Sequence, residues 1–239
     1  MAPALRLATR GSRQAWAQAS AIAELIRRPT GREVELVRID TTGDQRSEVP
    51  LHSIGGQGVF VKEVQRAVLD GRADLAVHSA KDLPTEPADG LTIAAFTARR
   101  DARDALIGRR LDDLAEGATV ATGSVRRRAQ LAVIRPDLDF RELRGNIDTR
   151  LGRIPDGGAV VMAVAALQIL DLTDRIAQFL PVDRFVPAVG QGCVAVEVRG
   201  DDVATTVAVA ELDDAATRAQ VEVERAFLAE LGSGCSLPV

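Results

Sequence analysis

The stretch LRLATRGSRQAWAQASAIAELIRR, residues 5–28, carries the two patterns that decide the fold. Its first four residues have the apolar alternation of a strand, and from residue 13 onward apolar residues recur at the spacing of a helix. A second strand pattern, VELVRI at residues 34–39, follows within a few residues. A strand, a helix and a strand in this order predict an α/β fold with parallel strands.

The same alternation continues along the chain. Further strands are predicted at residues 75–77, 91–95, 119–121, 139–143, 159–162 and 194–198. Helices are predicted at residues 13–28, 61–70, 125–134, 146–154 and 204–231, the last with a break near Asp213. The pattern predicts a largely parallel sheet. Any domain boundary must lie in short turns, such as TARRDARD at 97–104 and AVGQGC at 188–193.

The composition excludes several classes of protein. The chain has 239 residues, of which 46% are hydrophobic and 27% charged, as in an ordinary globular protein. A net charge of −4, one Trp and no Tyr argue against nucleic-acid binding. The longest apolar run, at 159–167, is too short to span a membrane, and no export signal is visible at the start. Two cysteines form no metal spacing. We therefore expect a cytoplasmic protein without metal.

Three predicted strand-to-helix junctions carry small or hydroxyl residues beside arginines. They read ATRGS at 8–12, ATGSVRRR at 121–128 and LRGNIDTR at 143–150. In α/β sheets, ligands bind at the carboxyl ends of strands, where helix N-termini offer unpaired N–H groups. The Ser and Thr residues are also good N-caps, the structural explanation for any one junction. Three such junctions together favour a small ligand with several acid groups, bound by Arg10, Arg126, Arg127, Arg144 and Arg150.

AVHSAKDLPT, at residues 76–85, is the other dense stretch. It places Lys81 and Asp82 just past a strand, where a carboxylate can stabilise a developing cation or relay a proton. A Lys-Asp step taken by itself is more often a solvated surface pair. Nothing in the sequence argues for a lowered Lys81 pKa. His78 is interpreted as a core histidine that hydrogen-bonds to backbone.

Seven stretches together resemble one family in order and spacing. They are RLATRGS, GGQGVFVKEV, DLAVHSAKDLPT, ATGSVRRRAQL, LRGNIDTRL, PAVGQG and LGSGCSLPV, and the match runs from residue 5 to residue 239. The family is porphobilinogen deaminase, also called hydroxymethylbilane synthase. The resemblance implies an enzyme that joins four porphobilinogen molecules head to tail into hydroxymethylbilane, with release of ammonia, in tetrapyrrole (porphyrin and haem) biosynthesis.

The resemblance also implies a dipyrromethane cofactor, attached by a thioether to Cys235 in the LGSGC loop. A thiolate adds readily to an electrophilic methylene, so the residue type fits this chemistry. By matching position, the catalytic residues are Asp82 and Lys81. Cofactor binding is assigned to Cys235, Ser79, Lys81, Asp82, Thr122, Ser124, Arg126, Arg127, Arg144 and Gly145. Substrate binding is assigned to Arg10, Ser12, Arg144, Arg150 and Gln191, whereas Arg128 is expected to be a solvated helix residue.

The fold that the resemblance implies has two domains of the type II periplasmic-binding-protein kind, with the active site in the cleft between them. Residues 1–97 with 193–210 form domain 1, and residues 98–192 form domain 2. Residues 211–239 are expected to be the remnant of a truncated third α/β domain that carries the cofactor loop. The apolar stripe of its helix, Ala219, Val223, Phe227 and Leu231, would then be exposed or docked elsewhere.

The chain departs from the family pattern at other places. Many relatives have lysines where this chain has Ser53 and Gln57, and an arginine where it has Ile169, so one or more carboxylate contacts are expected to be missing. An inward-facing helix position is an equally good explanation for Ile169. Porphobilinogen is the expected partner, with no nucleic acid and no membrane. We expect a monomer, with self-association through the exposed C-terminal helix as the alternative.

Two other functions remain open at this stage. One is an impaired deaminase-like protein that binds acidic pyrroles without turnover. The other is a two-domain module that binds or senses an organic acid, because the same fold serves many functions. The arginine-rich junctions suit all three hypotheses, and only Cys235 with Asp82 separates the first two from the last.

Overall fold

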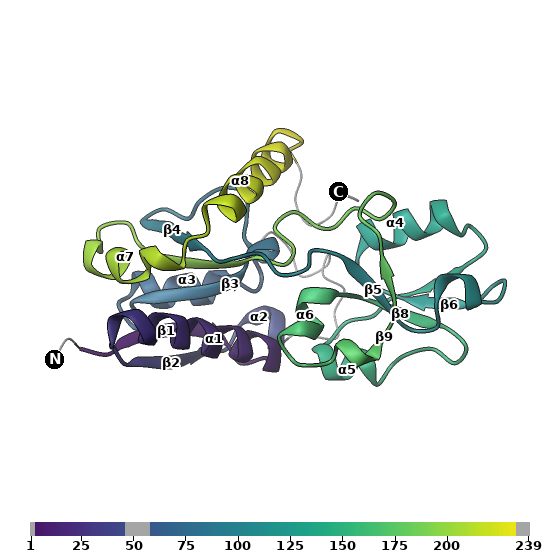
Figure 1. The fold of residues 1–239 in the computed structure, drawn as a ribbon, viewed down its shortest axis with the longest axis horizontal. Coiled ribbons are helices and arrows are strands. Elements are labelled where there is room, and N and C mark those ends of the chain that lie inside the picture. The colour runs from purple at the N-terminus through teal and green to yellow at the C-terminus, as the bar shows by residue number, and fades with distance from the viewer. Residues whose placement is uncertain (1–2, 46–57, 233–239) are drawn as a thin grey trace.

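The computed structural model describes residues 3–45 and 58–232, arranged around two five-stranded sheets that lie side by side (Figure 1). The first sheet contains β1 (Leu5–Arg10), β2 (Val34–Ile39), β3 (Leu75–Ser79), β4 (Leu91–Phe96) and β10 (Val194–Arg199). The second contains β5 (Asp104–Gly108), β6 (Thr119–Ala121), β7 (Asp139–Arg141), β8 (Ala159–Ala163) and β9 (Ile176–Leu180). The α/β prediction is confirmed.

The two sheets share one topology. Their strand orders are β2-β1-β3-β10-β4 and β7-β6-β8-β5-β9. In each, four strands run in one direction, and the fourth strand in the order, β10 or β5, is antiparallel to both of its neighbours. The prediction of largely parallel strands is therefore confirmed for four of the five strands in each sheet, and the one antiparallel strand makes each sheet mixed. Strands β5 and β9 were not predicted, because both are short and carry a polar residue, Asp104 at the start of β5 and Gln178 within β9.

Helices cover both faces of each sheet. Those of at least five residues are α1 (Arg13–Thr30), α3 (Lys62–Leu69), α4 (Val125–Ile134), α5 (Ile147–Leu151), α6 (Val164–Gln168), α7 (Val203–Val209) and α8 (Ala215–Glu230). The short elements are α2 (Thr42–Gln45), η2 (Ala80–Asp82), η3 (Leu111–Asp113), η4 (Thr173–Arg175) and η5 (Ala210–Leu212). The predicted break near Asp213 is confirmed, because η5 ends there and Asp214 caps α8.

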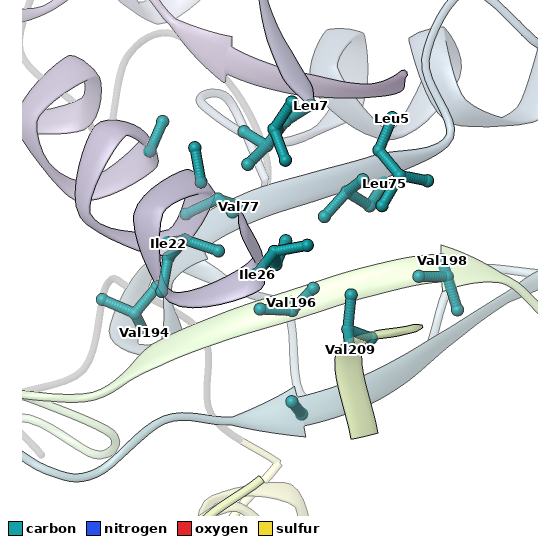
Figure 2. Packing of buried hydrophobic residues seen from close by; sticks show 14 residues of the cluster. Leu5, Leu7, Ile22, Ile26, Leu75, Val77, Val194, Val196, Val198 and Val209 are labelled. Carbon is teal, nitrogen blue, oxygen red and sulfur yellow. The ribbon is translucent and has the colours of Figure 1, made fainter. Parts of the chain in front are cut away.

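Each sheet has its own core. On the first sheet, Ile22 and Ile26 of α1 lie over Leu7, Val77 and other residues of β1, β3 and β10 (Figure 2). The opposite face is covered by Val64, Ala67 and Val68 of α3. The second sheet is covered by α5 and α6 on one face and by Leu131 of α4 on the other. No helix in the described ranges is both long and apolar enough to cross a membrane.

The chain passes between the sheets twice, at 97–103 and at 181–193, and these two crossing segments are hydrogen-bonded to each other. Thr97 N donates to Val194 O at 3.0 Å, and Arg100 N donates to Gly192 O at 2.9 Å. Gly190 has φ +68, and an added Cβ would lie about 3.1 Å from Ala80. A glycine is needed here because the second crossing segment passes directly against η2.

Helix α8 packs beside the crossing segments on one edge, and its other face is open. Val221 is buried against Phe96 and Cys193, while Val223, Phe227 and Leu231 are 70%, 60% and 47% exposed. The predicted exposed stripe is confirmed, and Ala219 is exposed with it. The proposed domain boundaries at residues 97, 192 and 210 remain a prediction.

Candidate active site

A cavity of about 900 Å³ lies between the two sheets. The first sheet contributes the carboxyl ends of β1 and β3, with Arg10, Ser12, Ser79, Lys81 and Asp82 among the lining residues. The second contributes Arg127 from the first turn of α4, Arg144 and Gly145 from the loop before α5, and Arg150 from α5 itself. These nine residues were predicted from the sequence to bind cofactor or substrate, and the fold gathers them in one cleft.

The cleft is strongly cationic. Seven of its described lining residues are Lys or Arg, namely Arg10, Arg38, Lys81, Arg127, Arg144, Arg150 and Arg153, against three acids, Asp40, Asp82 and Glu142. Burial, followed by repulsion from Arg127, lowers the pKa of Arg150 to about 10. Burial also lowers the pKa of Arg144. Partly desolvated cations that lie close to one another favour a ligand with several negative charges.

Lys81 and Asp82 lie on η2, immediately after β3. The Lys81 ammonium donates to Gln191 Oε1 at 3.3 Å. Burial, and then the nearby Arg127 charge, lower the pKa of Lys81 to about 8, against the opposing effects of Asp82 and Asp104. The expectation of an ordinary Lys81 pKa is therefore wrong, because the sequence does not reveal that the side chain is enclosed among cations.

Arg126 and Arg127 are consecutive residues of α4, but only Arg127 lines the cleft. Both donate to Asp104, through Nη2 of each at 2.7 Å, and both are buried. Arg127 also donates to Val161 O and lines the cleft, whereas Arg126 donates to Val186 O and is not among the lining residues. The Nε of Arg127 is buried and has no hydrogen-bond partner among the described residues.

Asp104 is the residue that sequence reasoning missed. Burial would raise the pKa of its carboxyl, but the guanidinium groups of Arg127 and Arg126 hold that pKa below its usual range. The residue starts β5, a strand that carries no strong pattern, and its partners lie 22 and 23 positions away. No spacing in the sequence indicates this contact.

The hydroxyl and amide residues at the junctions are helix caps. Ser12, Ser124 and Asn146 accept hydrogen bonds from the first turns of α1, α4 and α5, so the structural explanation for these positions is confirmed. Thr122 accepts a hydrogen bond from Ser124 N. Neither Thr122 nor Ser124 lines the cavity. Gly145 does, at φ +115, and its carbonyl accepts from Arg150 Nε at 2.8 Å.

Gln191 lies behind the wall of the cleft, and His78 is part of that wall. Gln191 is 1% exposed and does not line the cavity, so its predicted substrate contact would have to be indirect. His78 is buried as expected, but its neighbour is not backbone: Nε2 lies 3.2 Å from Oε2 of the buried Glu197. The prediction of a backbone partner is wrong, since Glu197 on β10 faces His78 across the sheet.

Further residues of the site could not be predicted from motifs. The Arg10 guanidinium lies 4.1 Å from the centre of the Phe60 ring, and both residues line the cleft. Ser79 hydrogen-bonds to Gln18 of α1 at 3.2 Å.

Ile169 packs half-buried against the core of the second sheet, which confirms the inward-facing explanation, and Arg128 is exposed as expected. Cys235, Ser53 and Gln57 lie outside the described residues.

Solved structures of low identity resemble the fold. The Methionine Binding Protein, MetQ, matches with a TM-score of 0.54 and 13% identity, over 93% of both chains. An ABC transporter periplasmic substrate-binding protein from Coxiella burnetii matches with a TM-score of 0.51 and 13% identity, over 92% of this chain and 96% of that one. These likenesses concern the fold alone, and they confirm two units of the periplasmic-binding-protein kind.

Sequence comparisons identify the family. Residues 5–207 match the family described as "Porphobilinogen deaminase, dipyromethane cofactor binding domain". Porphobilinogen deaminase of Acidothermus cellulolyticus is 49% identical, over 98% of this chain and 73% of that protein. Porphobilinogen deaminase 1 of Streptomyces coelicolor is 47% identical, over 99% of this chain and 76% of that protein. The chain therefore belongs to the porphobilinogen deaminase family.

Proposed function

We propose that the protein is a hydroxymethylbilane synthase, which condenses four porphobilinogen molecules head to tail and releases one ammonia per molecule. One observation carries the proposal: the cleft of this family member places Asp82 beside Lys81 and among a surplus of arginines, of which Arg127 is buried. Each porphobilinogen has an acetate and a propionate, so a growing chain brings two carboxylates per ring. Guanidinium groups bind such carboxylates bidentately.

The lining residues also fit a dipyrromethane group, which carries four carboxylates on two rings. Arg127, Arg144, Arg150 and Lys81 supply cations from both sides of the cleft, and the buried Arg127 Nε lacks a partner in the described chain. When bound, dipyrromethane supplies the pyrrole carbon on which the chain of rings begins. The protein's own contribution is to neutralise its carboxylates and fix its orientation.

Cys235 is the proposed attachment point. The other cysteine, Cys193, is buried, and burial raises the pKa of its thiol to about 12. A thiol of that kind forms almost no thiolate at neutral pH and is a poor nucleophile. This leaves Cys235 as the residue for a thioether. An adduct of dipyrromethane mass on the Cys235 peptide, absent in Cys235→Ser, is the expected result of intact-mass and peptide analysis.

Asp82 is the proposed catalytic residue. A porphobilinogen that has lost its amine carries positive charge toward the ring nitrogen, and a carboxylate beside that nitrogen stabilises the charge and can hold the transferred proton. Lys81 is mainly protonated at neutral pH, because its pKa is about 8. It therefore acts first as a cation that binds a substrate carboxylate, and a change in its protonation would alter substrate binding.

The direct test is to supply porphobilinogen and measure ammonia and linear tetrapyrrole together. The proposal expects four ammonia released for each tetrapyrrole formed. Binding of porphobilinogen without ammonia release would instead support the impaired, binding-only hypothesis.

A monomeric state and a cytoplasmic location are further parts of the proposal. The exposed apolar residues of α8 make self-association the competing state. Sedimentation of the parent and of Phe227→Glu distinguishes the two, because only a dimer formed through α8 would dissociate in the variant. Fractionation of the native cell checks the location.

A further inference from the structure

Behind the cleft, the carboxylate of Asp104 joins three side chains. Its Oδ1 accepts hydrogen bonds from Arg127 Nη2 at 2.7 Å and from Gln191 Nε2 at 2.9 Å, and its Oδ2 accepts from Arg126 Nη2 at 2.7 Å. Asp104 is 0% exposed. An anion buried this completely needs its cationic partners, and it in turn restrains where their guanidinium groups lie.

The amide of Gln191 can lie in only one orientation. Its Nε2 faces two acceptors, Asp104 Oδ1 and Ala102 O at 2.7 Å. Its Oε1 must then face the other way, where it accepts from Lys81 Nζ at 3.3 Å. Gln191 therefore connects Asp104, at the start of β5, to Lys81, at the end of β3.

In this hydrogen-bond network, the two end residues line the cleft and the two residues between them do not. Lys81 and Arg127 line the cavity from opposite sheets, whereas Asp104 and Gln191 are enclosed behind its wall. Gln191 belongs to the crossing segment at 181–193, so the hydrogen-bond network passes through the connection between the two sheets.

We propose that Asp104 and Gln191 are positioning residues that hold Arg127 and Lys81 in one relative arrangement in the cleft. The inference depends on the proposed function only for the identity of the ligand that Arg127 and Lys81 bind. The positioning itself concerns contacts within the chain. It also gives Gln191 a role that acts through Lys81 instead of by contact with substrate.

A purely structural role for this buried cluster would leave the protonation of Lys81 unchanged, which makes Lys81 the informative readout. The charged groups that face Lys81 are Arg127 of α4, Arg150 of α5, Asp104 of β5 and the neighbouring Asp82. Gln191 contributes the hydrogen-bond acceptor that favours the charged ammonium. Loss of that acceptor should therefore lower the Lys81 pKa.

The chain offers a clean way to measure this, because Lys62 and Lys81 are its two lysines. Trace acetylation across pH 6 to 11, followed by peptide mass spectrometry, gives the reactivity of Lys81 relative to exposed Lys62. The probe is acetic anhydride, and no turnover is needed. The variants are Gln191→Met, which keeps the side-chain length, and Asp104→Asn. Gln178→Met is the matched control, since Gln178 accepts from Leu111 N on the second sheet, away from the cleft.

In the parent, Lys81 is expected to titrate near pH 8. In Gln191→Met the midpoint should fall by about one pH unit, with kcat/KM for porphobilinogen reduced roughly tenfold. Gln178→Met should match the parent in both. Asp104→Asn should shift the midpoint in the same direction. If it does not fold, the Gln191→Met result decides.

An unchanged Lys81 midpoint in a folded Gln191→Met protein would overturn the inference. The outcome is independent of the proposed function. A shifted midpoint in a protein that releases no ammonia would support the positioning role and reject the enzymatic activity.

Discussion

The guanidinium of Arg99 lies 2.6 Å from a carboxylate oxygen of Glu224, so the first crossing segment is ion-paired to α8. Arg99 Nε also donates to Gln191 O at 2.9 Å, and the Glu224 carboxylate accepts from Gly190 N at 2.8 Å. One pair thus ties both crossing segments to the last described helix. These contacts, together with buried Val221 and the hydrogen bonds of Arg218 and Arg225 to backbone carbonyls, hold α8 in place while its apolar stripe stays exposed.

Loss of Glu224 should therefore destabilise the protein. Glu224→Ala leaves Arg99 and Gly190 N without their partner, and we expect it to reduce the free energy of unfolding by about 1–3 kcal/mol. Glu222→Ala is the control: its pair with Arg218 is more exposed and should contribute at most about 1 kcal/mol. Denaturant unfolding of both variants measures the difference, and equal losses would contradict this function for the Arg99–Glu224 pair.

Gly190 and Gly157 form a second matched comparison. Both have positive φ, +68 and +66, so alanine at either costs about 1 kcal/mol of backbone strain. Only at Gly190 would the added Cβ press on Ala80 and the Lys81 backbone, since nothing lies within 4 Å at Gly157. Gly190→Ala should lose more stability than Gly157→Ala and should also lose activity. Equal melting temperatures and equal turnover would show that the crossing segment does not constrain η2.

Arg144 should contribute to ligand binding, whereas Arg128 should not. Arg144 lines the cleft, and Arg128 is exposed near Phe140. Loss of a charge-assisted hydrogen bond costs about 1.5–3 kcal/mol, so Arg144→Gln should raise KM for porphobilinogen or lower cofactor occupancy by about 10- to 100-fold. Arg128→Gln should change neither by more than about twofold. Steady-state kinetics and intact mass report the two quantities.

Ligand binding should take up protons near pH 8. In the free protein the Lys81 pKa is about 8, and an anionic ligand raises it, so between the free and bound pKa values binding adds a proton to Lys81. Calorimetry of porphobilinogen binding, in buffers of different ionisation enthalpy, measures this uptake, with a slowly reacting variant such as Asp82→Asn to suppress turnover. Lys81→Met in the same background should abolish the uptake. Persistence of the uptake there would assign the proton to another group.

The sequence predicted much of the cleft but not the contacts that organise it. Arg10, Arg144 and Arg150 stand at strand-to-helix junctions, where local pattern is enough to place them at the carboxyl ends of strands. Asp104 and Gln191 are 87 residues apart in the sequence, and they are in contact only because the two crossing segments converge. No local pattern encodes such a contact. The lowered Lys81 pKa depends on the same convergence, because burial and neighbouring charges are properties of the fold.

Strands β5 and β9 were missed for a related reason. In β5, the buried Asp104 looks like a loop residue in the sequence, and only its ion pairs with Arg126 and Arg127 make it compatible with a strand. In β9, Gln178 uses its amide to accept from Leu111 N, and Phe179 is exposed, so the apolar pattern is weak. Tertiary partners override local preference at both places.

The most direct test of the whole account is the rate of ammonia release from porphobilinogen by the parent, Asp82→Asn and Asp89→Asn. Asp82 lines the cleft, whereas Asp89 is an exposed residue of the segment before β4. We expect steady ammonia release by the parent and by Asp89→Asn, and a loss of at least about 100-fold in Asp82→Asn, with similar melting temperatures for all three. Turnover of Asp82→Asn within a few-fold of the parent, or no ammonia from the folded parent, would contradict the account.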